Sequence, residues 1–313
     1  MTNKDNPLLC DPESGVCEIP NVDTTEKSKI NIATQKKPVK IIYFTDPICS
    51  TCWGIEPQLR KLKLEYGSEV EVEYRMGGLL PDWSYNSGGI SKPSDVAHHW
   101  DEVSHYYNMP INGDVWLEDP LHSSYPPSIA FKAAQIQDET KAIAFLRKLR
   151  EMVFLEKKNI TKWENISNAA KTVGLDIEKL KTDFESDAIA LFKTDLELAR
   201  EMGVRGFPTM FMKGTQQKSE TVYGFKPYAV FEKAITDVYP EVEKRNYYKD
   251  LLKIFQKYPT LTLREAAEIS EQTLETTQTQ LENLTAEQKL SIYKTKNGNI
   301  WHLKEREFEL STH

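Results

Sequence analysis

The sequence lacks the marks of several large classes of protein. It has only four cysteines in 313 residues, too few for a disulfide-stapled secreted miniprotein. It has no apolar run near the ~18 residues that a membrane-spanning helix needs. It also lacks a large excess of one charge, since 47 acidic residues oppose 40 basic ones for a net charge of -7. We therefore expect neither a membrane partner nor general binding to nucleic-acid phosphates.

The amino terminus lacks the pattern of a secretory signal. Residues 1–20 are polar and carry no cationic stretch followed by an apolar one. We therefore expect a cytoplasmic protein. In a reducing compartment cysteines are seldom structural crosslinks, so the few that are present need a chemical explanation of their own.

The apolar patterns near the amino terminus predict a tail followed by a strand–helix–strand unit. Residues 1–37 are polar and interrupted by prolines, which predicts a flexible tail. Residues 39–44 are β-branched and aromatic, typical of a strand buried on both faces of a parallel sheet. Residues 55–66 follow with helical spacing, and residues 70–76 alternate as a strand with one wetter face. This order predicts a right-handed βαβ unit.

A long insertion separates this unit from a second group of strands. Residues 84–202 begin with Gly- and Pro-rich sequence and become strongly helical. Two short strands, 210–212 and 221–223, and a helix at 227–238 follow after a loop. The sequence thus predicts an α/β domain that spans residues 38–242.

A separate module is predicted at residues 243–313. Three short helical patterns precede residues 291–303, where two β-type runs flank an Asn-Gly turn. Three helices and a hairpin predict a winged-helix-like module. Its third helix carries three glutamates and no basic residue, so it lacks the cations that a groove-entering helix needs. We expect protein docking or dimerisation rather than DNA binding, and a homodimer is compatible with this prediction.

The motif that carries chemistry is C-S-T-C at residues 49–52, after the first strand and at the start of a helix. Unpaired N–H groups and the partial positive charge of a helix amino terminus stabilise a thiolate there. We predict Cys49, at the more exposed helix end, as the attacking thiol and Cys52 as the resolving thiol. A zinc site would need two more ligands, and the other cysteines, Cys10 and Cys17, lie in the tail. We expect no metal and no cofactor.

Residues 39–239 resemble the DsbA-like branch of the thioredoxin superfamily, in which a helical subdomain is inserted between the two halves of the fold. The segment DPICSTCWGIEP at 46–57 is similar to the FrnE dithiol isomerase group and to the YjbH (SpxH) adaptor group. The carboxy-terminal module is also similar to the tail of the YjbH group. Three further segments resemble YjbH in particular: GDVW at 113–116, AFKAA at 130–134 and KKNIT at 157–161.

This resemblance implies two functions for one fold. FrnE-like function implies disulfide exchange on protein substrates by Cys49 and Cys52, with a cis Phe207-Pro208 peptide shaping the substrate groove. YjbH-like function implies an adaptor that holds a Spx-type regulator and promotes its degradation by the ClpXP protease without turnover. The leading hypothesis is the thiol–disulfide oxidoreductase or isomerase, and the adaptor is the alternative. Isomerisation of small aromatic compounds is disfavoured, because the similar proteins with that activity have a single serine in the site and no CxxC motif.

Several residues beside the motif have predicted supporting roles. Thioredoxin carries a buried carboxylate on the strand before its motif, and Tyr43 stands at that position here. Proton transfer to Cys52 is therefore assigned to Glu56, one turn along. Trp53 is predicted to form a wall of the substrate groove. Pro57 falls inside the predicted helix, where proline costs about 3 kcal/mol unless a kink accommodates it.

The amino-terminal cysteines form a second, separate pair. Cys10 and Cys17 lie in a compact turn that could close a small disulfide, bind a soft metal or stay reduced. A further hypothesis is that this segment acts as an internal thiol partner of Cys49. The sequence leaves these alternatives open.

Overall fold

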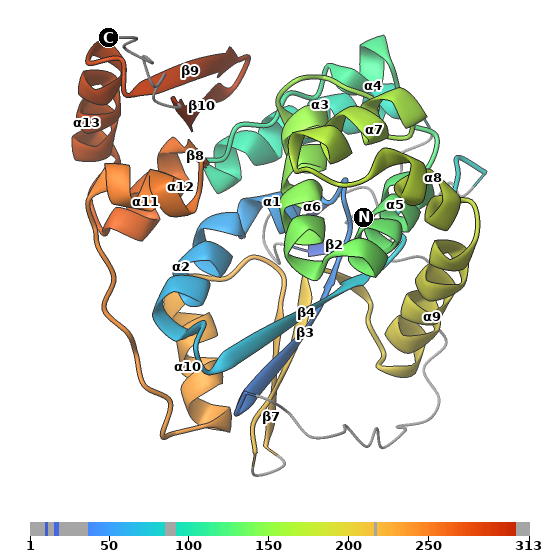
Figure 1. Cartoon of the computed structure of the whole chain (residues 1–313), viewed down its shortest axis with the longest axis horizontal. Helices are drawn as coiled ribbons and strands as arrows, with labels where there is room; N and C mark the ends of the chain where they lie inside the picture. The colour runs from blue at the N-terminus through green and yellow to red at the C-terminus, as the bar shows by residue number, and fades with distance from the viewer. Residues whose placement is uncertain (1–9, 12–15, 19–36, 85–91, 216–217, 305–313) are drawn as a thin grey trace, which may run out of the picture.

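A four-stranded mixed sheet of order β4-β3-β6-β7 forms the centre of the protein (Figure 1). β3 (Val39–Thr45) is parallel to β4 (Val70–Met76) and antiparallel to β6 (Thr209–Lys213). β7 (Ser219–Tyr223) completes the sheet antiparallel to β6. The predicted α/β thioredoxin-like fold is confirmed. The computed structural model describes residues 10–11, 16–18, 37–84, 92–215 and 218–304.

Two helices, rather than one, make the crossover from β3 to β4. They are α1 (Ser50–Gly54) and α2 (Glu56–Tyr66), and Ile55 interrupts the helix between them. Pro57 lies in the first turn of α2, where the missing N–H of proline would have no partner in any case. The expected cost of a proline inside one continuous helix is therefore wrong, because the helix restarts just before it.

The helical insertion packs on one side of the sheet (Figure 1). Phe131 of this insertion meets Tyr74 of β4 with ring centroids 6.2 Å apart. The fully buried Asp195 accepts a hydrogen bond from the backbone N–H of Met76 at 3.0 Å. The helices are α3 (Pro93–Tyr107), α4 (Val115–Glu118), α5 (Tyr125–Gln137), α6 (Glu139–Phe154), α7 (Trp163–Thr172), α8 (Ile177–Phe184) and α9 (Asp187–Glu201).

A second, three-stranded sheet joins the amino-terminal segment to the domain. Its order is β1-β2-β5, built from β1 (Cys10–Asp11), β2 (Val16–Glu18) and β5 (Gly206–Phe207). The sequence predicts only a loop at β5 and a tail at β1 and β2. Of the rest of the predicted tail, only residue 37 lies within the described residues.

The carboxy-terminal unit follows α10 (Tyr228–Val238) and has its own apolar core. The predicted hairpin is present as β9 (Leu290–Thr295) and β10 (Gly298–Leu303). An additional strand, β8 (Thr260–Thr262), pairs with β10 to give the order β8-β10-β9. The likeness of this unit to a winged helix stays a prediction. Its helices are α11 (Leu251–Lys257), α12 (Leu263–Ser270) and α13 (Leu274–Ala286).

Buried ion pairs fix this unit to the thioredoxin-like domain. Glu265 of α12 has no exposed surface and accepts two hydrogen bonds from Arg147 of α6, at 2.7 and 3.0 Å. Arg60 of α2 lies 3.3 Å from the same carboxylate and donates to the carbonyl of Thr260 at 2.7 Å. No helix within the described ranges is long and apolar enough to cross a membrane.

Candidate functional site

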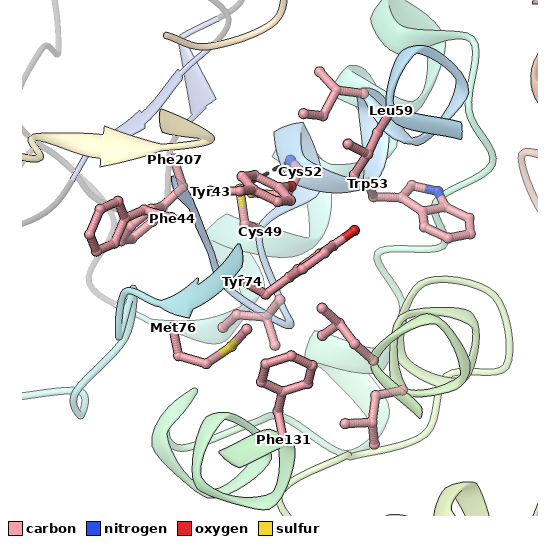
Figure 2. Packing of buried hydrophobic residues seen from close by; sticks show 14 of the residues in the cluster. Tyr43, Phe44, Cys49, Cys52, Trp53, Leu59, Tyr74, Met76, Phe131 and Phe207 are labelled. Carbon is pink, nitrogen blue, oxygen red and sulfur yellow. Dashed lines mark hydrogen bonds between the residues drawn. The ribbon is translucent and has the colours of Figure 1, made fainter. Parts of the chain in front are cut away.

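The two motif cysteines lie where β3 passes into α1 (Figure 2). Cys49 is the N-cap residue of α1, and its Sγ accepts a hydrogen bond from the backbone N–H of Cys52 at 3.2 Å. The motif therefore lies at the amino terminus of a helix, as predicted. Neither cysteine has any exposed surface, so the expectation that Cys49 is the more exposed thiol is wrong.

The two sulfurs have different electrostatic surroundings. Burial raises the pKa of Cys49, and the neighbouring Cys52 raises it further. Burial opposes ionisation of Cys52 as well, but a hydrogen bond from Cys49 and the charge of Arg150 outweigh it and lower the pKa of Cys52. In this closed arrangement the thiolate is favoured on Cys52. That polarity is opposite to the predicted assignment of Cys49 as the attacking thiolate, and the catalytic roles of both residues stay predictions.

Arg150 is the buried cation of the site, and the sequence analysis missed it. Its guanidinium donates to Glu56 Oε1 and to Thr45 Oγ1, both at 2.5 Å. The Thr45 hydroxyl donates in turn to the Tyr43 hydroxyl at 3.0 Å. Glu56 is therefore held by an ion pair beside the motif, and its assignment to proton transfer stays a prediction.

A sequence signal for Arg150 does exist. Leu146, Leu149 and Val153 mark the buried face of α6, and Arg150 falls among them at helical spacing. A charged side chain within an apolar stripe needs a buried partner of opposite charge. The sequence cannot name that partner, because Glu56 lies in a distant part of the chain.

Asp46 is a second residue that the sequence analysis missed. It follows β3 and is fully buried, and its carboxylate accepts hydrogen bonds from the backbone N–H groups of Ile48 and Leu79 at 3.0 and 2.8 Å. The hydroxyl of Ser124 donates to it at 2.8 Å. Burial raises the pKa of Asp46 to about 6 against the opposing effect of these hydrogen bonds. Asp46 thus ties the motif loop to the helical insertion.

The Phe207-Pro208 peptide is cis, as predicted. Thr209 pairs with Phe44, so the preceding residues lie beyond the carboxyl end of β3, where the motif loop begins. Phe207 is buried over Gly77, where an added Cβ would come within 1.8 Å of the ring. Figure 2 shows Phe207 in the same packed cluster as the motif cysteines. The role of Phe207 and Pro208 in substrate binding stays a prediction.

Trp53 lies in the core and does not form a groove wall. It has no exposed surface, and its indole N–H donates to the carbonyl of Pro110 at 3.0 Å. Its ring stacks on Phe154 with centroids 5.6 Å apart, and the guanidinium of Arg147 lies 4.3 Å from its centroid. The predicted contact between Trp53 and substrate is therefore wrong. Helices of the insertion enclose the ring instead.

The amino-terminal cysteines are placed only through their backbones. Cys10 stands opposite Cys17 in the antiparallel pairing of β1 with β2. What their thiols do stays a prediction. In the part of the chain that the structure describes, no group of three or more His, Cys, Asp or Glu residues could hold a metal ion.

Comparisons with known proteins separate the fold from the family. The thioredoxin family model matches residues 43–233. The ClpXP adapter protein SpxH of Halalkalibacterium halodurans is 34% identical over 307 residues, covering 96% of this chain and 99% of that protein. SpxH of Bacillus subtilis is 30% identical over 271 residues, covering 85% and 89%. The cytosolic disulfide reductase DsbM of Pseudomonas aeruginosa has a TM-score of 0.51 at 20% identity, covering 62% of this chain and 97% of that chain.

The coverage of these matches carries the assignment. The likeness to DsbM shows the thioredoxin-like fold alone, because identity is low and over a third of this chain is left unmatched. The match to the adapter of Halalkalibacterium halodurans leaves about 4% of the chain unmatched, so it extends into the carboxy-terminal unit. The chain therefore belongs to the SpxH family of thioredoxin-like proteins.

Proposed function

We propose that this protein is an adaptor that holds a Spx-type regulator and promotes its degradation by the ClpXP protease. The observation that carries the proposal is the nearly full-length match to a ClpXP adapter protein, at 96% of this chain and 99% of that protein. Such a role places the protein in the cytoplasm with its protease. Turnover of disulfides is not required for this function.

The geometry around α1 supports a binding role. Thiol exchange needs an attacking sulfur that a substrate can reach, and both motif sulfurs are fully buried. An adaptor needs fixed surfaces that hold partners in a set relation. Arg264 of the carboxy-terminal unit donates to the carbonyl of Gly54 at 3.3 Å and to the carbonyl of Tyr107, which fixes that unit to the end of α1.

Reconstituted proteolysis tests the adaptor function. Purified ClpXP and a labelled Spx-type regulator are incubated with and without this protein, and the half-life of the regulator is measured. We expect a half-life shortened at least about tenfold, equal to ~1.4 kcal/mol of barrier. The double variant Cys49→Ser, Cys52→Ser should retain this acceleration within about twofold, since binding requires no exchange. An unchanged half-life with the wild-type protein contradicts the proposal.

A second candidate function is thiol–disulfide exchange on protein substrates by Cys49 and Cys52. The observation that favours it is the lowered pKa of Cys52. Burial raises this pKa, but a hydrogen bond from Cys49 and the charge of Arg150 outweigh that effect. The cis Phe207-Pro208 peptide lies at the same end of β3 and would align an extended substrate. This function requires the site to open, because the cysteines are enclosed.

Insulin reduction in a glutathione buffer tests the second candidate. Exchange predicts turnover well above that of the buffer alone, and loss of this turnover in Cys49→Ser. A rate equal to that of the buffer, and insensitive to Cys49→Ser, excludes exchange. The adaptor function survives that result, so the two functions can be told apart.

A further inference from the structure

The amino-terminal segment returns to the motif as a strand. β2 pairs antiparallel with β5, and the register sets Cys17 opposite Phe207 and Glu18 opposite Gly206. Cα atoms of β2 also lie within 8 Å of Cα atoms of α1. Figure 1 shows β2 at the end of the central sheet where α1 begins. A segment distant in sequence thus lies beside the start of the motif helix.

β5 is the edge that an external chain would use. It directly precedes Pro208, and it lies outside the four-stranded sheet. Within the described residues, β2 is the only strand that pairs with β5. An unpaired strand edge recruits extended protein segments by β-augmentation, with main-chain hydrogen bonds providing the affinity. In this structure the protein's own amino-terminal segment takes that position.

The closed state encloses the groups that an external chain would meet. Cys49 and Phe207 have no exposed surface, and Pro208 is buried as well. β2 pairs with β5, which contains Phe207 and ends just before Pro208, and it approaches α1, whose N-cap is Cys49. A chain cannot pair with β5 at the same register while β2 remains there. Access to this edge therefore requires β2 to leave.

The contact is suited to reversible opening. β2 has three residues and β5 has two. A hydrogen bond contributes only about 0.5 to 1.5 kcal/mol net to stability. A pairing this short can therefore open locally while the rest of the fold persists. The covalent connection to the domain keeps the strand at a high effective concentration, so that it also returns readily.

We propose that β2 is a built-in occupant of the β5 edge, which closes the motif until an extended segment of a protein partner displaces it. The proposal rests on the proposed function only in naming a protein chain as the competitor. The amino-terminal segment then sets a threshold for binding, because a partner must outcompete an occupant that is always present. No covalent step is involved.

Accessibility of Cys49 tests the proposal in the full-length chain. One variant carries Cys10→Ser, Cys17→Ser and Cys52→Ser; the other differs only in having Cys17→Pro. Cys49 is the one thiol left in each, so iodoacetamide labelling followed by mass spectrometry reports on it alone. Serine keeps the backbone N–H and the strand conformation, whereas proline removes the donor and disfavours pairing opposite Phe207. We expect alkylation at least about tenfold faster with proline, ~1.4 kcal/mol easier to open.

Equal alkylation rates in the two variants would overturn the proposal. Hydrogen exchange of the segment 203–209 provides a second measurement. It should speed up with proline, while the segment 39–45 in β3 serves as an internal control for the intact fold. Faster alkylation with unchanged exchange at 206–207 would also overturn the proposal, because another element would then be the cover. Neither measurement contains a regulator or ClpXP, so failure here is distinct from failure of the adaptor function.

Discussion

The two ends of α1 are covered by very different contacts. At its amino end, Cys49 is buried beside a pairing between a three-residue strand and a two-residue strand. At its carboxyl end, Gly54 accepts a hydrogen bond from Arg264 of a unit that is fixed by buried ion pairs. The contact at the amino end depends on a few backbone hydrogen bonds, and the contact at the carboxyl end depends on desolvated charges. The amino end of α1 therefore has a cover that can open, and its carboxyl end has a junction that persists.

Glu265 is the central residue of the junction at the carboxyl end of α1. Besides Arg147 and Arg60, its carboxylate accepts the backbone N–H of Thr262 at 2.8 Å, and the Thr262 hydroxyl accepts the backbone N–H of Glu265 at 3.3 Å. This capping box begins α12. The carboxylate therefore joins the helix start to two arginines of the thioredoxin-like domain.

The largest expected effect comes from breaking this junction. Glu265→Ala removes the fully buried carboxylate that Arg147 and Arg60 share, so that, among the described residues, only Glu151 and Glu56 still pair with them. It also removes the capping box, so we expect a loss of about 3 to 5 kcal/mol in the free energy of unfolding. Urea unfolding at pH 7 measures it. Glu282→Ala, at an exposed position of α13, is the matched control and should change stability by less than about 0.5 kcal/mol. Similar losses in both variants would remove the distinction between the two ends of α1.

The buried carboxyl group of Asp46, near the amino end of α1, makes stability depend on pH. Burial raises the pKa of Asp46 to about 6, so the folded state favours its protonated form. Its contribution to stability is full below the unfolded value of 3.8 and is lost as pH rises through about 6, a change of about 3 kcal/mol. Urea unfolding of wild type and Asp46→Asn should show the variant gaining relative stability by about that amount between pH 3.5 and pH 7.

Glu265 provides the opposite sign. Burial alone would raise its pKa, but Arg147 and Arg60 outweigh burial and lower it. Its contribution is present above the unfolded value of about 4.3 and is lost as pH falls through the lower folded value. The destabilisation caused by Glu265→Gln should therefore shrink on acidification. If the variants of Asp46 and Glu265 responded to pH with the same sign, the two sites would not differ as described.

Local patterns made most of the thioredoxin-like domain predictable. Residues 39–44 and 70–76 form strands because their apolar patterns fit a sheet, and the observed strands differ from them by at most a residue at one end. The motif was placed correctly at a helix start because β3 ends just before it. The helix break at Ile55 was missed, although Pro57 signals it, because the apolar spacing continues across the break.

The site itself depended on contacts between distant segments, which one sequence does not encode locally. The pair of Arg150 with Glu56 joins α6 to α2, and neither residue names the other. The short β5 has no strand pattern of its own and exists through its pairing with β2. Trp53 was placed on a groove because its neighbours are catalytic in type, whereas packing against Phe154 decides its burial.

A smaller effect is expected at the motif. Burial raises the pKa of Cys52, whereas a hydrogen bond from Cys49 and the charge of Arg150 lower it. Arg150→Met removes this charge, so the titration midpoint of Cys52 should move to higher pH. Arg150→Lys retains a charge and should move it less. The absorbance of the thiolate at about 240 nm reports this midpoint in a Cys49→Ser background, with Cys49→Ser, Cys52→Ser as the blank. An unmoved midpoint would show that Arg150 does not set the polarity of the pair.

The smallest effect is expected where the same junction reaches solvent. Lys296, in the turn between β9 and β10, lies 2.5 Å from Asp101 and 2.8 Å from Asp114, and its side chain is 44% exposed. Lys296→Ala should cost less than about 1 kcal/mol, because water already solvates these charges and the long side chain loses entropy when fixed. The cost should fall further in high salt, whereas that of Glu265→Ala should hardly change. If Lys296→Ala cost as much as Glu265→Ala in urea unfolding, pairing of charge alone would hold the junction and burial would add nothing.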